Sequence, residues 1–410
     1  MAVKMSKIAG RIGLLLLCGA MLHSCLYMLE KKNSKKVDVD MEALGEAFAK
    51  GTRTIPVVFL ETEGHKGINN KEYWKDAQVQ EFYYALGLKE DVEVKGRGNS
   101  TWAFPKKPFN IKFDGEHSFL RLPKGKKFCA LANWRDRTRI RNAVALEIAR
   151  QTTMEWTPEG TFVDLVLDGN WYGNFYVTEK VEPEKLGLGK GCFLLQIDDH
   201  FDEPYRFHSK LKGLPVNVMV ADGIALDAKA FDSIKAIVDN FEDALYNNKA
   251  DWTKLIDLQS FCDWFLVYEI AGTDEPSDPK GIYMYCREDG VLHAGPCWDF
   301  DYHTFCPGTK GLVNAHAIWF EELLKRQEFK DMLKQRWYDI RYRIQVMIPD
   351  YIDALFEKLH ESVDLDYEIW PYKVIKTNGD EDLSFEEACE RLKIGFNQRF
   401  AVMKIYCESL

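Results

Sequence analysis

The spacing of apolar residues along the chain changes near its middle. Before about residue 225 the apolar runs are short and alternate with polar positions, as at residues 54–61 and 108–113. In the second run Phe109, Ile111 and Phe113 fall on one face, because successive side chains of extended backbone point to opposite sides. The first part of the chain is therefore predicted to be rich in strands.

Turn sequences that contain glycine join other apolar runs into two predicted hairpins. The first connects residues 162–167 to 171–180 through the turn DGN, and the second connects residues 281–287 to 291–300 through the turn EDG. Single short strands are expected at residues 91–95 and 192–197.

Apolar residues recur every three or four positions in several longer segments, which predicts helices. These segments are residues 137–151, 228–247, 254–271, 318–359 and 384–410. All but the first lie in the second half of the chain, where the second hairpin interrupts them. The pattern predicts an α+β fold with a strand-rich lobe at about residues 51–225 and a helix-rich lobe at about residues 226–410.

Length and composition are consistent with a folded body of this size. The chain has 410 residues, of which 46% are hydrophobic and 29% charged, as in globular proteins. Lys and Arg together number 54 against 64 Asp and Glu, and the formal net charge is -10. A negative net charge provides no general attraction for a phosphate backbone, so nucleic-acid binding is not expected.

Residues 1–24 have the features of an export signal. A basic start precedes an apolar run at residues 12–22, which is shorter than the ~17–25 residues needed to cross a bilayer. Residues 22–25 (LHSC) resemble the lipobox of bacterial lipoproteins. The resemblance implies lipid modification of Cys25, a tether at residues 25–50 and a folded domain at residues 51–410. It also implies an exported protein, lipid-anchored to a bacterial membrane in the cell envelope. A simple cleaved signal and a short uncleaved anchor are the alternatives.

The ten cysteines do not indicate a zinc site, because no two of them form a C-x-x-C pair. Cys286, Cys297 and Cys306 are close enough in sequence to form disulfides in an oxidising compartment. Buried free thiols, as expected for Cys262 within an apolar helix, are the other interpretation.

Residues 95–113 (KGRGNSTWAFPKKPFNIKF) combine glycines with several cations in one connection between strands. Gly96 and Gly98 would let the backbone approach a phosphate group, whose charge the cations could neutralise. These cations are Arg97, Lys106, Lys107 and Lys112. The segment is not a P-loop, since G-x-x-x-x-G-K-[ST] is missing, and a solvated basic turn is the alternative.

Residues 295–302 (GPCWDFDY) place two carboxylates close together at the end of the second predicted hairpin. Asp299 and Asp301 are two positions apart, so extended backbone would point both to one side, where they can share a divalent cation. Burying carboxylates among aromatic residues is costly without a counter-ion, which favours metal binding. The alternative is a hydrogen-bonded turn or salt bridges to arginines.

A third carboxylate follows the predicted helix at residues 254–271. Asp274 lies directly after this helix, where it could accept a proton from a substrate hydroxyl, although taken alone it is an ordinary turn residue. A glycosidase that uses Asp299 and Asp274 would also explain paired carboxylates, but it leaves the basic glycine-containing segment without a role.

Four blocks of sequence, taken in order, resemble the CotH kinases, a family named for a bacterial spore-coat protein. The blocks are RGNSTW with KKPFNIKF, LANWRDRTRIRNAVALEIAR, VLDGNWYGNFYVTEKVE and GPCWDFD. The resemblance implies a divergent, two-lobed protein-kinase-like fold. It also implies an atypical kinase that binds ATP with Mg or Mn and phosphorylates Ser or Thr of protein partners.

The same resemblance implies roles for the three carboxylates. Asp299 would bind the metal ion of a DFG-like element with help from Asp301, and Asp274 would be the catalytic base. Family members often have Asn close before this base, whereas here Gly272 and Thr273 precede it. A non-catalytic surface lipoprotein of the same fold, which binds a protein or a glycan, is therefore the alternative function.

Nucleotide-binding roles also follow from the resemblance. Lys106 and Lys107 would hold phosphates, with Lys112 as a third candidate because it lies on a predicted strand. Glu147 could orient such a lysine, an inference from its place on the predicted helix at residues 137–151. Trp298 could stack on adenine or pack in the core.

Overall fold

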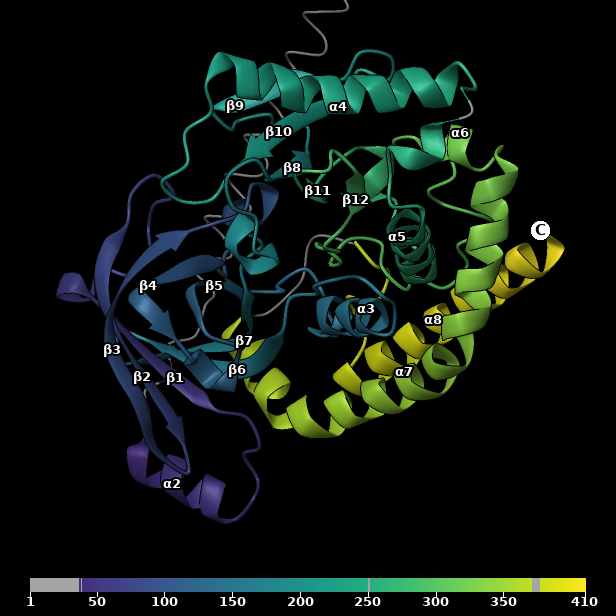
Figure 1. Ribbon diagram of the computed structural model, residues 1–410. Coiled ribbons are helices and arrows are strands. Elements are labelled where there is room, and N and C mark those ends of the chain that lie inside the picture. The colour runs from purple at the N-terminus through teal and green to yellow at the C-terminus, as the bar shows by residue number, and fades with distance from the viewer. Residues whose placement is uncertain (1–36, 38, 250, 371–376) are drawn as a thin grey trace, which may run out of the picture. The chain divides into compact units, whose positions relative to one another are not determined.

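A computed structural model describes residues 37, 39–249, 251–370 and 377–410, and its elements are labelled in Figure 1. The predicted export signal and the predicted lipidation site Cys25 lie outside the described residues. The described chain divides into two compact units. The first takes its residues from Met1–Trp134, Phe162–Val177 and Glu361–Lys373, and the second from Arg135–Thr161, Thr178–His360 and Val374–Leu410.

The strands are β1 (Val57–Thr62), β2 (Lys75–Tyr83), β3 (Ala85–Gly96), β4 (Phe109–His117), β5 (Gly125–Leu131), β6 (Gly160–Leu167), β7 (Asn170–Glu179), β8 (Phe193–Ile197), β9 (Tyr205–His208), β10 (Pro215–Met219), β11 (Ile282–Cys286) and β12 (Leu292–Ala294). The helices are α2 (Met41–Ala49), α3 (Arg141–Arg150), α4 (Ala228–Tyr246), α5 (Leu258–Ala271), α6 (Phe320–Leu323), α7 (Gln327–Ile369) and α8 (Phe385–Ser409). The predicted α+β class and the excess of strands in the first half are confirmed.

The first unit is built on a closed barrel, which the sequence pattern does not predict. Strands β1 to β5 pair in sequence order with antiparallel neighbours, followed by β7 and β6. Parallel pairing of β1 with β6 closes the barrel, with Val57 opposite Asp164 and Leu60 opposite Leu167. Alternate side chains fill its interior, where Phe109, Ile111 and Phe113 are almost completely buried, so their predicted shared face is confirmed.

Packing explains the glycines of the basic segment between β3 and β4. A Cβ on Gly96 would lie 2.3 Å from the ring of Trp102, and a Cβ on Gly98 would lie 2.0 Å from the hydroxyl of Thr101. Gly98 also has a φ of 81°, which favours glycine. The two glycines therefore let this connection fold back on itself.

A buried ion pair lies beside the barrel within the first unit. Lys106 Nζ is 2.6 Å from Asp366 Oδ1, and neither side chain has solvent exposure. The backbone N–H of Asn174 donates to the same carboxylate at 2.9 Å, and the Asn174 carbonyl accepts from Lys106. A Cβ on Gly173 would lie 2.1 Å from Asp366 Oδ1, so this close approach requires glycine. The pair thus joins the connection before β4 to the last turns of α7.

The second unit contains a five-stranded antiparallel sheet with the order β12-β11-β8-β10-β9. The predicted second hairpin is therefore part of this sheet, because β11 pairs with β8 from Ile282 opposite Ile197 to Cys286 opposite Phe193. The expectation that its second strand reaches residue 300 is wrong, since β12 ends at Ala294.

The eight cysteines in the described residues are free thiols, so the disulfide interpretation is not supported.

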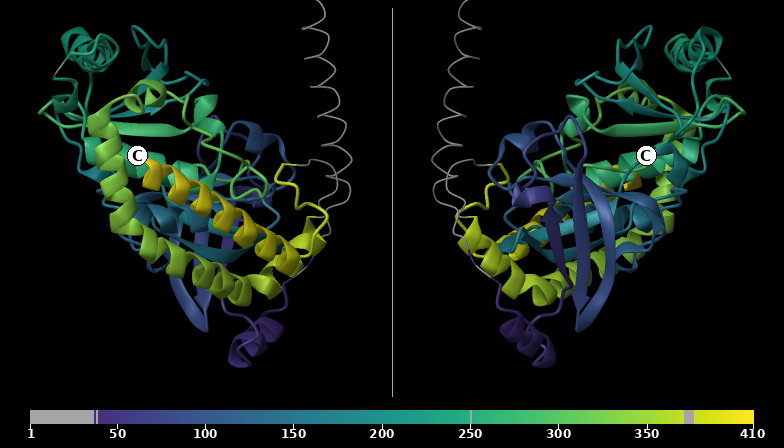
Figure 2. Two further views of the ribbon diagram at one scale, coloured as in Figure 1. Left: turned by 90° about the vertical axis from the view of Figure 1, so that its right-hand side faces the viewer. Right: turned by 90° about the vertical axis from the view of Figure 1, so that its left-hand side faces the viewer.

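Helix α5 is buried along nearly its whole length and forms the centre of the helical part. It begins later than predicted because the Asp257 side chain caps it by accepting from the Ser260 N–H at 2.7 Å. Figure 2 shows α8 running alongside α7. Lys393 lies 2.7 Å from Asp353, and Arg341 lies 3.0 Å from Glu408, so the two helices are antiparallel there.

None of the helices in the described residues has the length and apolar character needed to span a membrane.

The Lys106–Asp366 pair leads to a prediction about stability. Lys106→Met should lower the free energy of unfolding by about 3–5 kcal/mol, because it leaves a buried carboxylate without its cation. Lys112→Met is the matched control: Lys112 pairs with Glu93 near the surface, so its loss should cost only about 0–1 kcal/mol. Denaturant unfolding of both variants measures the difference, and equal losses would contradict a special role for the buried pair.

Candidate functional site

The C-terminal end of α5 positions the predicted catalytic base. Gly272 ends the helix in the left-handed conformation with a φ of 73°, and Thr273 behind it is buried. Asp274 then begins a short 3-10 helix, Glu275–Ser277. Its side chain is 51% exposed, and its Oδ1 lies 3.0 Å from Nδ1 of His303. The candidate base is therefore accessible and oriented by a second side chain.

The side chain of Glu275, on the same short helix, points into the protein interior. Burial, followed by the negative charges of Asp299 and Asp301, raises the pKa of Glu275 to about 10. Its Oε2 is buried and has no hydrogen-bond partner in the described part of the chain. The sequence pattern does not indicate a role for Glu275, whose only signal is its place next to Asp274.

Asp299 and Asp301 lie in a loop, so the expectation of extended backbone there is wrong. The strand has already ended, and Asp299 has a φ of 66°. Phe300 between them is buried, and its N–H donates to Asn142 Oδ1 at 2.8 Å. Both carboxylates nevertheless lie close enough to Glu275 to raise its pKa. Asp299 and Asp301, which the sequence predicts as metal ligands, thus both act on the Glu275 carboxylate within the second unit.

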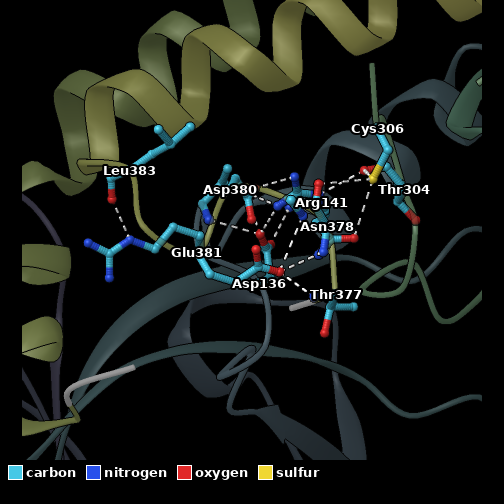
Figure 3. Close-up of polar contacts among 12 residues, drawn as sticks. Asp136, Arg141, Thr304, Cys306, Thr377, Asn378, Asp380, Glu381 and Leu383 are labelled. Atoms are coloured by element: carbon cyan, nitrogen blue, oxygen red, sulfur yellow. Dashed lines mark hydrogen bonds and ion pairs between the residues drawn. The ribbon is translucent and has the colours of Figure 1, made fainter. Parts of the chain in front are cut away.

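A buried arginine holds this loop in place, as the close-up in Figure 3 shows. The Arg141 guanidinium has no solvent exposure and pairs with Asp136 and, at 2.5 Å, with Asp380. Its Nε donates to the carbonyl of Thr304 at 2.8 Å. Burial alone would lower the pKa of Arg141, but Asp380 and Asp136 raise it, so the side chain stays charged. Figure 3 also shows Glu381, whose Oε1 accepts N–H groups from Thr377, Asn378 and Gly379.

The donor set fits a divalent metal ion of the magnesium type. Mg²⁺ prefers oxygen ligands and is commonly held by one or two carboxylates together with substrate phosphates. Asp299 and Asp301 supply such carboxylates, and the unpartnered Oε2 of Glu275 is a buried oxygen that a cation would satisfy. Where substrate phosphates complete the shell of such an ion, a protein does not need to supply three ligands at one point.

Among the described residues, the one group of three possible ligands whose atoms lie within 4.8 Å of one another is Glu61, His65 and Asp168 of the first unit, so Glu275, Asp299 and Asp301 do not form such a group. The Asp168 carboxylate there accepts N–H groups from Thr62 at 2.7 Å and from Gly67 at 2.9 Å. These bonds tie the β6–β7 turn to the segment after β1. The group is therefore explained as a structural turn contact.

The predicted phosphate ligands all belong to the first unit. The backbone N–H of Arg97 donates to the Pro108 carbonyl at 3.1 Å, and Lys106 is buried against Asp366. Lys107 and Lys112 are half-buried. Lys107 Nζ donates to the Trp102 carbonyl at 2.6 Å, and Lys112 pairs with Glu93. Their phosphate-binding roles stay predictions.

Two predicted nucleotide-binding residues belong to the second unit. Glu147 accepts hydrogen bonds from Arg150 at 2.9 Å and from Gln151 at 2.7 Å. Trp298 is 7% exposed, and its carbonyl accepts from the Tyr268 hydroxyl at 2.8 Å. The lysine-orienting role of Glu147 stays a prediction. Of the two roles expected for Trp298, adenine stacking and core packing, its burial favours core packing.

The raised pKa of Glu275 leads to a pH-dependent prediction. In the folded protein without metal, Glu275 binds a proton that the unfolded chain releases above about pH 4.5. Stability should therefore fall as pH rises from about 4.5 towards 10, and Glu275→Gln should remove this loss. We expect the variant to be more stable than the wild type by about 1–3 kcal/mol at pH 8 and equal to it at pH 4, as measured by urea unfolding without metal. A variant less stable at pH 8 would contradict the assignment.

A comparison with models of protein families identifies a match. The family model described as CotH kinase protein matches residues 94–403, which include the basic segment, α3, α5 and the loop with Asp299 and Asp301. A search of curated proteins found no match. Since the match covers most of the chain and contains the candidate site, the chain belongs to the CotH kinase family.

Proposed function

We propose that this protein is an atypical protein kinase, which uses ATP with Mg²⁺ or Mn²⁺ to phosphorylate Ser or Thr of protein partners. The observation that supports it most is the placement of Asp299 and Asp301 near the buried, unpartnered carboxylate oxygen of Glu275. Membership of the CotH kinase family points to the same class of activity. The proposal includes a divergent, two-lobed protein-kinase-like fold.

In this proposal Asp299 and Asp301 hold the metal ion through carboxylate oxygens. When bound, the ion would supply positive charge that neutralises the charge developing during phosphate transfer. Glu275 would add negative charge beside these two carboxylates and, once deprotonated, would help to hold the cation. The rate enhancement then comes from positioning and charge neutralisation, without a covalent intermediate on the enzyme.

Asp274 is proposed to accept the proton of the acceptor hydroxyl. Its exposure leaves room for a substrate, and the contact with His303 fixes the direction of the carboxylate. Among the cations of the first unit, we prefer Lys107 and Lys112 to Lys106 as phosphate ligands, because Lys106 is completely buried. Arg97 is the fourth candidate phosphate ligand.

The proposed location is the bacterial cell envelope, with a lipid anchor at Cys25 and protein substrates as partners. The alternative, a non-catalytic lipoprotein of the same fold, is favoured by Gly272 and Thr273 at positions where family members often have Asn. The two functions differ in one property that can be measured directly. The kinase must bind ATP in a metal-dependent manner, whereas the binding module need not.

Asp299→Ala should abolish metal-dependent nucleotide binding, because it removes a carboxylate that holds the ion. The measurement is the thermal shift of the purified protein with ATP plus MgCl₂ or MnCl₂, compared with ATP alone. Asp278→Asn is the matched control, since Asp278 is 71% exposed and pairs with Lys280. A wild-type protein without a metal-dependent shift would support the non-catalytic alternative.

Asp274→Asn should lower kcat for phosphate transfer by about 10²–10⁴-fold and leave nucleotide affinity almost unchanged. A base stabilises the transition state more than the bound ground state, so the change appears in kcat. Transfer of ³²P to a general acceptor protein and nucleotide titration measure the two quantities. Equal loss of both would identify Asp274 as a structural residue.

A further inference from the structure

A pocket of about 360 Å³ opens beside the candidate base in the second unit. Asp274 and His303 line the pocket, and Thr377, Asn378 and Gly379 line it as well. The remaining lining residues are Gly272, Cys306, Thr309 and Val313. Nearly all of these side chains are small, so the pocket has room for one or two side chains of a bound chain.

The walls of the pocket are fixed before any ligand arrives. Glu381 Oε1 accepts the N–H groups of Asn378 at 2.8 Å and of Gly379 at 3.2 Å. Asn378 Nδ2 donates to the Asp301 carbonyl at 3.1 Å, which ties this part of the lining to the acidic loop. Burial by itself would raise the pKa of Glu381. The backbone N–H groups that donate to its carboxylate lower the pKa by more, so the carboxylate remains charged at neutral pH. A preformed pocket of this kind binds a ligand without a large ordering cost.

The guanidinium of Arg391 lies next to Gly379, one of the lining residues. A Cβ on Gly379 would lie 3.1 Å from Nη2 of Arg391, so only this glycine's missing side chain leaves room for the close approach. The positive charge also acts on the thiol of Cys306, another lining residue. Arg391 Nε is buried and has no hydrogen-bond partner in the part of the chain that the structure describes. A buried donor in this state is costly unless a ligand accepts from it.

From these observations we infer that the pocket is the acceptor subsite, and that Arg391 selects acceptor segments with an acidic residue next to the phosphorylated Ser or Thr. The inference rests on the proposed kinase function, since it places the acceptor hydroxyl at Asp274. In this inference the acceptor side chain enters at Asp274 and His303, and the neighbouring carboxylate reaches Arg391 beside Gly379. Arg is suited to this role because its planar guanidinium can bind a carboxylate through two hydrogen bonds.

The experiment compares two fluorescent peptides on the full-length protein by anisotropy. One peptide has the sequence Gly-Gly-Ser-Glu-Glu-Gly-Gly, and the other has Gln in place of both Glu. The wild type should bind the acidic peptide about tenfold more tightly, the change expected for one charge-assisted hydrogen-bonded pair. Arg391→Gln should remove this preference. Lys404→Gln, which changes an exposed cation on the same helix, should keep it.

A second variant tests the pocket itself. Thr309→Phe places a large ring among the lining residues and should weaken binding of both peptides, while the thermal shift with ATP plus MgCl₂ shows that the protein remains folded. Equal affinity of the wild type for the two peptides, or a preference retained by Arg391→Gln, would overturn the inference. If the wild type binds nucleotide but shows no peptide preference, only the subsite assignment fails. If it binds no nucleotide, the proposed function fails and the acceptor role fails with it.

Discussion

The candidate site depends first on the buried guanidinium of Arg141. One cation joins the start of α3 to Asp136, Asp380 and the carbonyl of Thr304, and none of the charged side chains is exposed. Burying charges is costly unless every one is paired, so the network tolerates few alternative arrangements. It fixes the loop that follows Asp299 and the segment after residue 377. Further hydrogen bonds hold the acidic loop against α3 and α5, from the Phe300 N–H to Asn142 and from the Tyr268 hydroxyl to the Trp298 carbonyl.

Glu275 differs from the other acids near this network. It is half-buried, and burial together with the negative charges of Asp299 and Asp301 raises its pKa to about 10. Its Oε2 has no hydrogen-bond partner in the described residues, whereas the Asp366 carboxylate is paired with Lys106. A carboxylate with a strongly shifted pKa is typical of functional sites, which agrees with the proposed metal site.

Much of the fold could be predicted from local patterns. Alternation and helical spacing identified the barrel strands β1, β4 and β6, the sheet strand β8 and the helices α4 and α5, with errors mainly at their ends. One such error has a clear cause, since the Asp257 cap decides where α5 begins. The closed barrel and the pairing of β11 with β8 could not be predicted, because strand partners far apart in sequence leave no mark on local periodicity.

For the site, the sequence by itself determined the residue types and their order: carboxylates after α5 and after β12, and cations between β3 and β4. Only the tertiary structure decided what each side chain does. It buried Lys106 against Asp366, directed Glu275 inward and bent the chain at Asp299 into the left-handed region. The reason is physical: the groups that set these environments are distant in the chain, and Arg141 and Asp380, for example, are 239 positions apart. A residue's type is local information, but its charge state and exposure depend on what the fold places around it.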